Sequence, residues 1–188
     1  MTPERPQAAD AKELAVEASK GASRRSYPSA AEKSRPGGLY AAVDLGTNSC
    51  RMLIAEPRGS QFHVLDSFSK TVQLGAGLEA SGRLSRASMG RTMQALRICQ
   101  KKIETHGVSR MRLVATEACR RARNSKDFMR QIRREIGLEV EIIAAEEEAR
   151  LAVISCAPLV TARTEQLLVV DIGGGSTELV WIDLASVY

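Results

Sequence analysis

The sequence is poor in aromatic residues and in long apolar runs. Aromatic side chains make up only 4% of its 188 residues, so we expect a core built from Val, Ile, Leu, Met and Ala. No apolar stretch reaches the length of a membrane-spanning helix, and no apolar segment follows the first residues as it would in an export signal. These absences argue against a membrane protein and predict a protein of the cytoplasm.

Cysteine and histidine are too scattered to form a metal site. The four cysteines contain no C-x-x-C pair, and His63 and His106 complete no zinc-ligand spacing beside them. We therefore expect no structural zinc. Unpaired cysteines without an export signal also fit a reducing compartment.

Charge is unevenly distributed along the chain. The formal net charge is +5, but residues 83–134 are strongly basic and residues 135–188 are strongly acidic. A basic block can attract a polyanion and raise its local concentration, an effect that salt weakens. The same arginines equally fit the solvated faces of two helices, so both interpretations stay open.

A polar extension precedes the folded region. Residues 1–38 are rich in Ala, Ser, Pro, Arg and Glu without an apolar period, which predicts disorder. From residue 39 onward, alternating apolar and amphipathic stretches predict an α/β fold. The expected strands are 39–43, 50–56, 62–69, 112–115, 138–144, 166–171 and 177–182. The expected helices run to about residue 105 from a Ser85 cap, over 125–136, and from Glu146 to Pro158.

Two segments share one pattern, in which an apolar strand ends in Asp and a turn with Gly and hydroxyl residues leads to a second apolar strand. They read Val43-Asp44-Leu45-Gly46-Thr47-Asn48-Ser49 and Val170-Asp171-Ile172-Gly173-Gly174-Gly175-Ser176-Thr177-Glu178. Glycine lets the backbone turn and approach a ligand closely, and exposed N–H groups with hydroxyls can hold phosphate oxygens. Each Asp can hold a divalent ion or its bound water beside those phosphates.

One such turn alone fits an ordinary hairpin, because Asp-Gly combinations are common there. Two turns on successive units are typical of the actin-like ATPase fold, the ribonuclease H-like architecture shared by actin, sugar kinases and Hsp70 chaperones. We expect an α/β protein of this fold. Its first lobe would span 39–150, and 151–188 would form the opening hairpin of a truncated second lobe.

Four motifs in order resemble the exopolyphosphatase and guanosine pentaphosphate phosphatase (Ppx/GppA) family. They are the two turns, Ala115-Thr116-Glu117-Ala118-Cys119-Arg120, and Glu146-Glu147-Glu148-Ala149-Arg150-Leu151. The resemblance implies a Mg²⁺-dependent cytoplasmic hydrolase. Such an enzyme would release terminal phosphate from inorganic polyphosphate, or the 5′ γ-phosphate from guanosine pentaphosphate in the stringent response.

The resemblance also implies roles for individual residues. Glu148 would deprotonate the attacking water, and Arg120 would contact a phosphoryl oxygen. Metal and water would be held by Asp171 and Glu178, with Asp44 facing them from the first lobe. The phosphate cradle would consist of Gly46, Thr47, Asn48, Ser49, Gly173, Gly174, Gly175, Ser176 and Thr177. The full-length protein would be a homodimer without a membrane partner or specific nucleic-acid binding.

Some residues allow a simpler interpretation. Glu117 departs from the family pattern, and its charge predicts that it points away from the phosphate or pairs with an arginine such as Arg121. Without the resemblance, residues 146–148 fit a charged first turn of a helix. We expect four large apolar residues to lie in the core and not in a binding site: Trp181, Met89, Met93 and Met111.

Two other functions remain open at this stage. An actin-like fold also suits a kinase that transfers phosphate to a small acceptor, which would yield a phosphorylated product without free phosphate. Alternatively, the basic helices would bind polyphosphate or nucleic acid without turnover.

Overall fold

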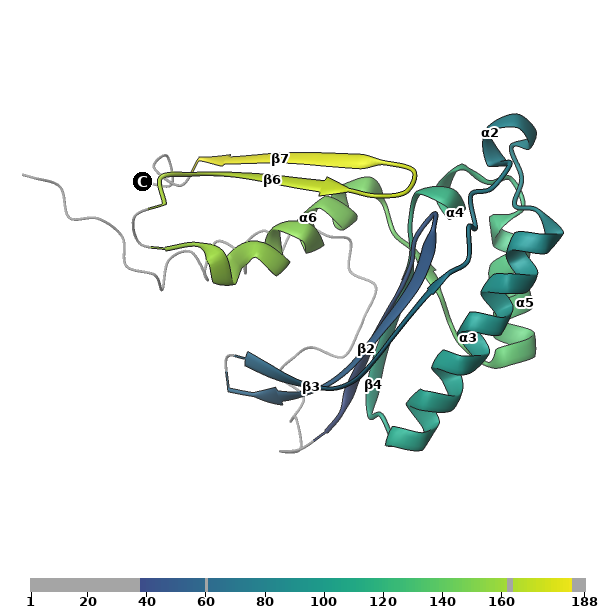
Figure 1. The fold of residues 1–188 in the computed structure, drawn as a ribbon, viewed down its shortest axis with the longest axis horizontal. Helices are drawn as coiled ribbons and strands as arrows, with labels where there is room; N and C mark the ends of the chain where they lie inside the picture. The colour runs from purple at the N-terminus through teal and green to yellow at the C-terminus, as the bar shows by residue number, and fades with distance from the viewer. Residues whose placement is uncertain (1–37, 60, 162–163, 184–188) are drawn as a thin grey trace, which may run out of the picture. The chain divides into compact units, whose positions relative to one another are not determined.

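A five-stranded mixed sheet organises the larger part of the protein in the computed structural model, which describes residues 38–59, 61–161 and 164–183 (Figure 1). The strand order is β3-β2-β1-β4-β5. The first three strands form an antiparallel meander, and β1, β4 and β5 run parallel. The strands are β1 (Tyr40–Leu45), β2 (Ser49–Arg58), β3 (Gln61–Thr71), β4 (Arg110–Ala115) and β5 (Glu141–Ile142).

Two long helices cover one face of this sheet. They are α3 (Arg86–His106) and α5 (Ser125–Ile136), and they pack against each other. Alternate residues of β1 and β2 point into this layer, so that Val43, Leu45 and Ile54 are buried with Phe128 of α5. Among the described residues Phe128 is the only buried aromatic residue, and the rest of the core is largely aliphatic, as the scarcity of aromatic residues predicts.

Both helices end where the sequence predicts. The Ser85 side chain accepts a hydrogen bond of 3.1 Å from the Ser88 N–H and caps α3. Gly107 ends α3 at a φ of 62° and Gly137 ends α5 at a φ of 78°, a left-handed conformation that glycine adopts without steric cost.

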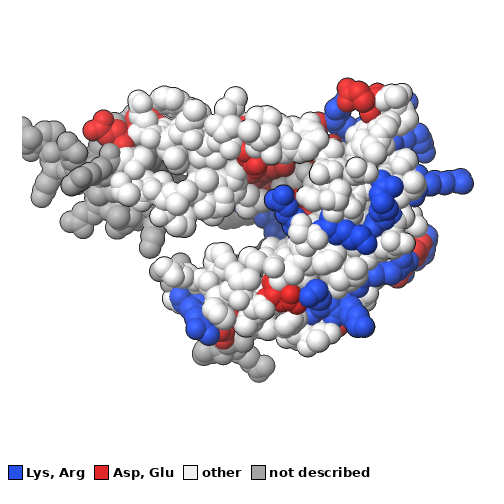
Figure 2. Space-filling view, viewed as in Figure 1, with Lys and Arg blue, Asp and Glu red and all other residues white. Residues whose placement is uncertain are grey.

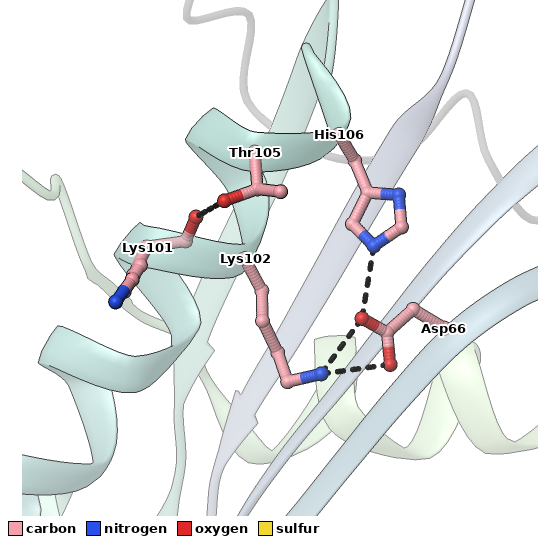
Figure 3. Close-up of polar contacts among 5 residues, drawn as sticks. All are labelled: Asp66, Lys101, Lys102, Thr105 and His106. Atoms are coloured by element: carbon pink, nitrogen blue, oxygen red, sulfur yellow. Dashed lines mark hydrogen bonds and ion pairs between the residues drawn. The ribbon is translucent and has the colours of Figure 1, made fainter.

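The outer strand of the meander is tied to α3 by one carboxylate. Asp66 on β3 lies 2.7 Å from Lys102 Nζ and 2.9 Å from His106 Nε2, both through its Oδ2 atom (Figure 3). Both partners lie on the last turns of α3. These contacts hold the pKa of Asp66 below its usual value, chiefly through the Lys102 hydrogen bond and then through His106.

The strand predicted over 138–144 is shorter in the structure. Only Glu141 and Ile142 pair with β4, through Val114 and Ala115, which are the last residues of that strand. Before this pair, Leu138 is buried in the core and does not continue the strand, and the residues after Ile142 lie beyond Ala115, where β4 ends. Two short helices that lack a detectable period were not predicted, α2 (Leu78–Ser81) and α4 (Glu117–Arg121).

The C-terminal part forms a second compact unit. It contains α6 (Ala145–Cys156), a 3₁₀ turn (Ala157–Leu159) that includes Pro158, and the antiparallel hairpin of β6 (Gln166–Ile172) and β7 (Thr177–Asp183). Helix α6 contacts both strands. Figure 1 shows α6 running along the hairpin with its N-terminal end toward the β6–β7 turn.

The two faces of the hairpin differ. Val169 is buried, while Leu168 and Trp181, which pair across the strands, are 53% and 62% exposed. The prediction that Trp181 lies in the core is therefore wrong, because a single helix covers only one face of a two-stranded element. Met111, at 50% exposure on β4, likewise lies outside the core. The same prediction is confirmed for Met93, which is buried in the core, and Met89 packs against it. No helix within 38–59, 61–161 or 164–183 is long and apolar enough to cross a membrane.

Candidate active site

The two predicted phosphate turns have the same closure. Each links antiparallel strands through four residues, with Leu45 opposite Cys50 in the first hairpin and Ile172 opposite Thr177 in the second. The Gly46 N–H donates to the Ser49 carbonyl at 2.9 Å, and the Gly173 N–H donates to the Ser176 carbonyl at the same distance. The shared pattern in the sequence thus corresponds to a shared backbone geometry.

The middle of each turn offers free donors. Among the residues that the structure describes, the backbone N–H groups of Thr47 and Asn48 have no acceptor, and neither do those of Gly174 and Gly175. Adjacent free N–H groups in a turn form a concave site for anions. Both turns therefore present backbone donors of the kind that suits phosphate oxygens.

The loop at residues 72–75 supports the first turn through hydrogen bonds. The Asn48 carbonyl accepts hydrogen bonds of 2.9 Å from the N–H groups of both Val72 and Gln73, and the Thr47 carbonyl accepts one of 3.0 Å from Gly75. Arg91 on α3 donates in turn to the Val72 carbonyl at 2.8 Å. These bonds engage the carbonyls of both middle residues of the turn and fix its backbone. The sequence offered only the Gly-rich composition of 75–82 as a signal for this support.

The charged residues beside the two turns differ. Asp44 lies directly opposite Arg51 across β1 and β2, whereas Asp171 lies directly opposite Glu178 across β6 and β7. Residues directly opposite in an antiparallel pair share one face, and two like charges there repel each other unless a cation joins them. The second hairpin therefore places two carboxylates side by side on one face, whereas the first places a carboxylate opposite an arginine.

Magnesium fits this carboxylate pair. Mg²⁺ usually binds through one or two carboxylates together with waters and substrate phosphates, and not through a cage of protein ligands. Asp171 and Glu178 supply two carboxylates, and within the described ranges no group of three or more acidic, histidine or cysteine ligands is present. The pair thus suits an ion that keeps open positions for a phosphate.

Glu148 lies at the same end of this unit. It belongs to the first turn of α6, the end of the helix that lies toward the β6–β7 turn (Figure 1). Asp171 and Glu178 lie near the same turn, on the face of the hairpin that also carries the buried Val169. The neighbour of Glu148, Glu147, forms two short contacts with Arg150, of 2.7 and 2.9 Å. These contacts raise the pKa of Arg150. Glu147 thus has a structural partner within α6.

Arg120 has an internal partner that the sequence did not assign to it. Its Nη2 atom lies 3.0 Å from Glu117 Oε2, and its Nη1 donates to the Ile143 carbonyl at 3.1 Å. Glu117 also lies 3.8 Å from Arg121, the partner named from the sequence, and Arg121 contacts Glu79 at 3.1 Å. Glu117 therefore holds Arg120 in place and partly neutralises it.

Two buried thiols, those of Cys50 and Cys119, do not supply a nucleophile. Burial raises the pKa of Cys119 to about 12, and hydrogen bonding to the Cys99 thiol raises the pKa of buried Cys50 above its usual value. The thiolate is the reactive form of cysteine, so these groups are inert near neutral pH.

Much of the basic block is neutralised by folding. Acidic side chains that follow it in the sequence pair with it in space, as in Arg97 with Glu135 at 3.4 Å and Arg133 with Glu139 at 3.5 Å. Figure 2 shows that Lys and Arg side chains still gather on the part of the molecule formed by α3 and α5. The solvated-face interpretation holds for the paired arginines.

Comparison with known proteins places the chain among phosphatases. Residues 53–188 match the Ppx/GppA phosphatase family. A solved Ppx/GppA family member from Aquifex aeolicus is 36% identical, with a TM-score of 0.70 over 79% of this chain and 48% of that one. An exopolyphosphatase from Cytophaga hutchinsonii ATCC 33406 is 27% identical, with a TM-score of 0.70 over 77% and 46%. The chain spans about half the length of these proteins.

Proposed function

Because this chain belongs to the Ppx/GppA phosphatase family, we propose that it forms part of a hydrolase that removes the terminal phosphate from a phosphoanhydride substrate. The substrates we consider are inorganic polyphosphate and guanosine pentaphosphate. The observation that carries the proposal is the second hairpin, where two directly opposed carboxylates lie beside a turn with free N–H groups.

In the proposed reaction, water attacks the terminal phosphorus atom. The bond between that phosphorus and the bridging oxygen breaks, and the bridging oxygen leaves with its electron pair on the shortened substrate. One proton of the water passes to Glu148, and the attacked phosphoryl group is released as orthophosphate. Such reactions depend mainly on in-line positioning and charge neutralisation, because the protein contributes little covalent chemistry. A positioned general base adds about 10²- to 10⁴-fold to the rate.

Each remaining residue has a binding or positioning role in this proposal. Asp171 and Glu178 would hold Mg²⁺, which supplies positive charge to the phosphoryl oxygens. The turns at 46–49 and 173–176 would cradle phosphates, with Thr177 following the second turn, and Asp44 would add a carboxylate from the first hairpin. Arg120, held by Glu117, would contact a phosphoryl oxygen. We propose the cytoplasm as the location and a homodimer as the assembly.

The test compares two glutamates of one helical turn. Phosphate release from tripolyphosphate and long-chain polyphosphate is measured with Mg²⁺ for the wild type, Glu148→Gln and Glu146→Gln. We expect Glu148→Gln to lose about 10²- to 10⁴-fold in kcat. Glu146 is exposed on the same turn, so Glu146→Gln should stay within about twofold of the wild type.

Other outcomes would overturn parts of the proposal. Retained turnover in Glu148→Gln would remove Glu148 from its role as base. A phosphorylated acceptor without free phosphate would indicate a kinase. Binding that is independent of Glu148 and occurs without turnover of any substrate would indicate a binding protein.

A further inference from the structure

The loop before α3 and the loop before α5 are joined by hydrogen bonds. The Asn124 side chain accepts from the Leu84 N–H at 2.8 Å and donates to the Leu84 carbonyl at 3.0 Å. The Arg123 N–H donates to the Gly82 carbonyl at 3.1 Å. Asn124 is only 8% exposed, so these bonds are shielded from water and fix the loops that precede α3 and α5 side by side.

Four cations project from these joined loops, and we call them the basic strip: Arg83, Arg86, Arg123 and Lys126. All four are exposed. Among the described residues none of them has a carboxylate partner, whereas Glu79 and Asp127 nearby already pair with Arg121 and Arg130. Unlike the arginines neutralised by folding, the basic strip therefore keeps its charge available.

The basic strip lies toward the end of the sheet at which β1 and β4 finish, which is also the end that carries the first phosphate turn. Strand β1 ends at Leu45 and the parallel strand β4 ends opposite it at Ala115, so the 46–49 turn and α4 emerge together. Strand β3 ends opposite Ser49, and its continuation through α2 leads to Arg83. An anion held at the turn would thus have the strip on its own side of the lobe.

The composition of the strip favours a bare polyanion over a nucleic acid. Proteins that bind single-stranded nucleic acid place aromatic side chains beneath the bases. Between residues 78 and 90 and between 117 and 130, both within the described structure, the only aromatic side chain is Phe128, which is buried. The strip offers charge without a stacking surface.

We propose that the basic strip holds the distal part of a linear inorganic polyphosphate chain while its terminal phosphate is processed elsewhere. This inference rests on the proposed function and deepens it, because the strip would favour long polyphosphate over guanosine pentaphosphate. The charges are exposed, so the contribution is electrostatic and falls as salt rises.

Binding is measured apart from turnover. Long-chain polyphosphate and tripolyphosphate are titrated calorimetrically without Mg²⁺, at low and at physiological salt. We expect Arg83→Gln/Arg86→Gln/Arg123→Gln/Lys126→Gln to bind the long chain about 10- to 100-fold more weakly, as the loss of four exposed charge contacts predicts. Its affinity for tripolyphosphate and its turnover of that substrate should not change.

The control variant removes the same number of positive charges from exposed positions within α3 and α5, away from the basic strip. It is Lys101→Gln/Arg130→Gln/Arg133→Gln/Arg134→Gln. Equal weakening in the control would reduce the effect to net charge and overturn the proposal. If the fourfold strip variant does not fold, judged by its thermal transition, Arg86→Gln/Lys126→Gln replaces it and should lose about three- to tenfold.

Further outcomes separate this inference from the proposed function. Unchanged binding of the long chain by the strip variant, beside normal hydrolysis of tripolyphosphate, would overturn the strip and leave the hydrolase. Strip-dependent binding in a protein that hydrolyses neither substrate would support the strip and overturn the hydrolase. Strip-dependent binding of single-stranded RNA, as tight as that of polyphosphate, would overturn polyphosphate as the occupant.

Discussion

At the scale of single residues, Asp66 joins the outer strand of the sheet to the long helix (Figure 3). Its folded-state pKa lies below the ordinary value of an aspartate because Lys102 and His106 stabilise the carboxylate. The stabilisation is present above the unfolded pKa and is lost as the pH falls through the folded pKa. Because of Asp66, the stability of this unit should fall as the pH becomes acidic.

We predict that Asp66→Asn lowers the melting temperature at neutral pH and that this difference shrinks as the pH falls below the normal titration range of aspartate. Thermal unfolding of the wild type and the variant, from neutral pH into the acid range, measures this difference in melting temperature. The control is Glu104→Gln, since Glu104 is an exposed acid on α3 without an ion pair among the described residues. A difference that grows toward low pH would contradict the prediction.

The residues of the candidate site were predictable to different degrees. Asp44, Asp171 and the glycines of both turns were proposed because one pattern occurs twice, and the two turns do share their backbone closure. The pairing of Glu117 with Arg120 was missed because both Arg120 and Arg121 lie within one helical turn of Glu117, and only the fold decides between them. The assigned catalytic and metal-binding roles stay predictions.

At the scale of elements, the first turn and the loop behind it act as one unit. A Cβ atom at Gly75 would lie 2.4 Å from the Thr47 Cγ2 methyl. A contact this short forces one side to move, so Gly75 lets the loop approach the turn. Gln73 in the same loop has a φ of 48°, a conformation that costs a residue with a side chain about 1 kcal/mol.

We predict that Gly75→Ala lowers the free energy of unfolding by about 1–3 kcal/mol, as overpacking does, and weakens phosphate binding by displacing Thr47. Thr47→Ser removes the clashing methyl and keeps the hydroxyl. The double variant Gly75→Ala/Thr47→Ser should therefore recover most of both losses, as measured by denaturant unfolding and tripolyphosphate titration. Independent, additive losses would argue against a steric link between the two residues.

Helices long enough to show a repeating apolar pattern were predictable from the sequence, and short elements were not. The limits of α5 and the caps of α3 agree with the sequence because Ser85, Gly107 and Gly137 mark them. The predicted extent of β5 was wrong, since an apolar residue such as Leu138 can be buried in the core without pairing in the sheet, and only Glu141 and Ile142 pair with β4. Helices α2 and α4 are too short to show a period, and they form where the chain returns over the sheet edge.

At the scale of the whole molecule, the family and the actin-like fold were predicted correctly. The predicted disordered extension lies almost wholly outside the described residues, and the lobe boundaries stay predictions. The two described units differ in their cores. The sheet unit buries more than twenty apolar residues, whereas helix α6 buries none and the hairpin buries Val169 alone.

We predict that backbone amides of β6 and β7 exchange with solvent at least about tenfold faster than those of β1 and β4, because amide protection follows the local free energy of opening. Hydrogen exchange followed by mass spectrometry measures both units in one sample. Phe128→Ala, which opens a cavity in the sheet core and should cost about 3–5 kcal/mol, should raise exchange in β1 and β4 most. Equal protection of both units in the wild type would contradict the prediction.

The position of Trp181 has an experimental consequence. It is the only tryptophan of the protein, and it lies on the exposed face of the hairpin that carries Asp171 and Glu178 on its other face. Intrinsic fluorescence excited at the indole band therefore reports on this hairpin and is blind to the five-stranded sheet. The chain contains its own optical label at the element where a metal ion would bind.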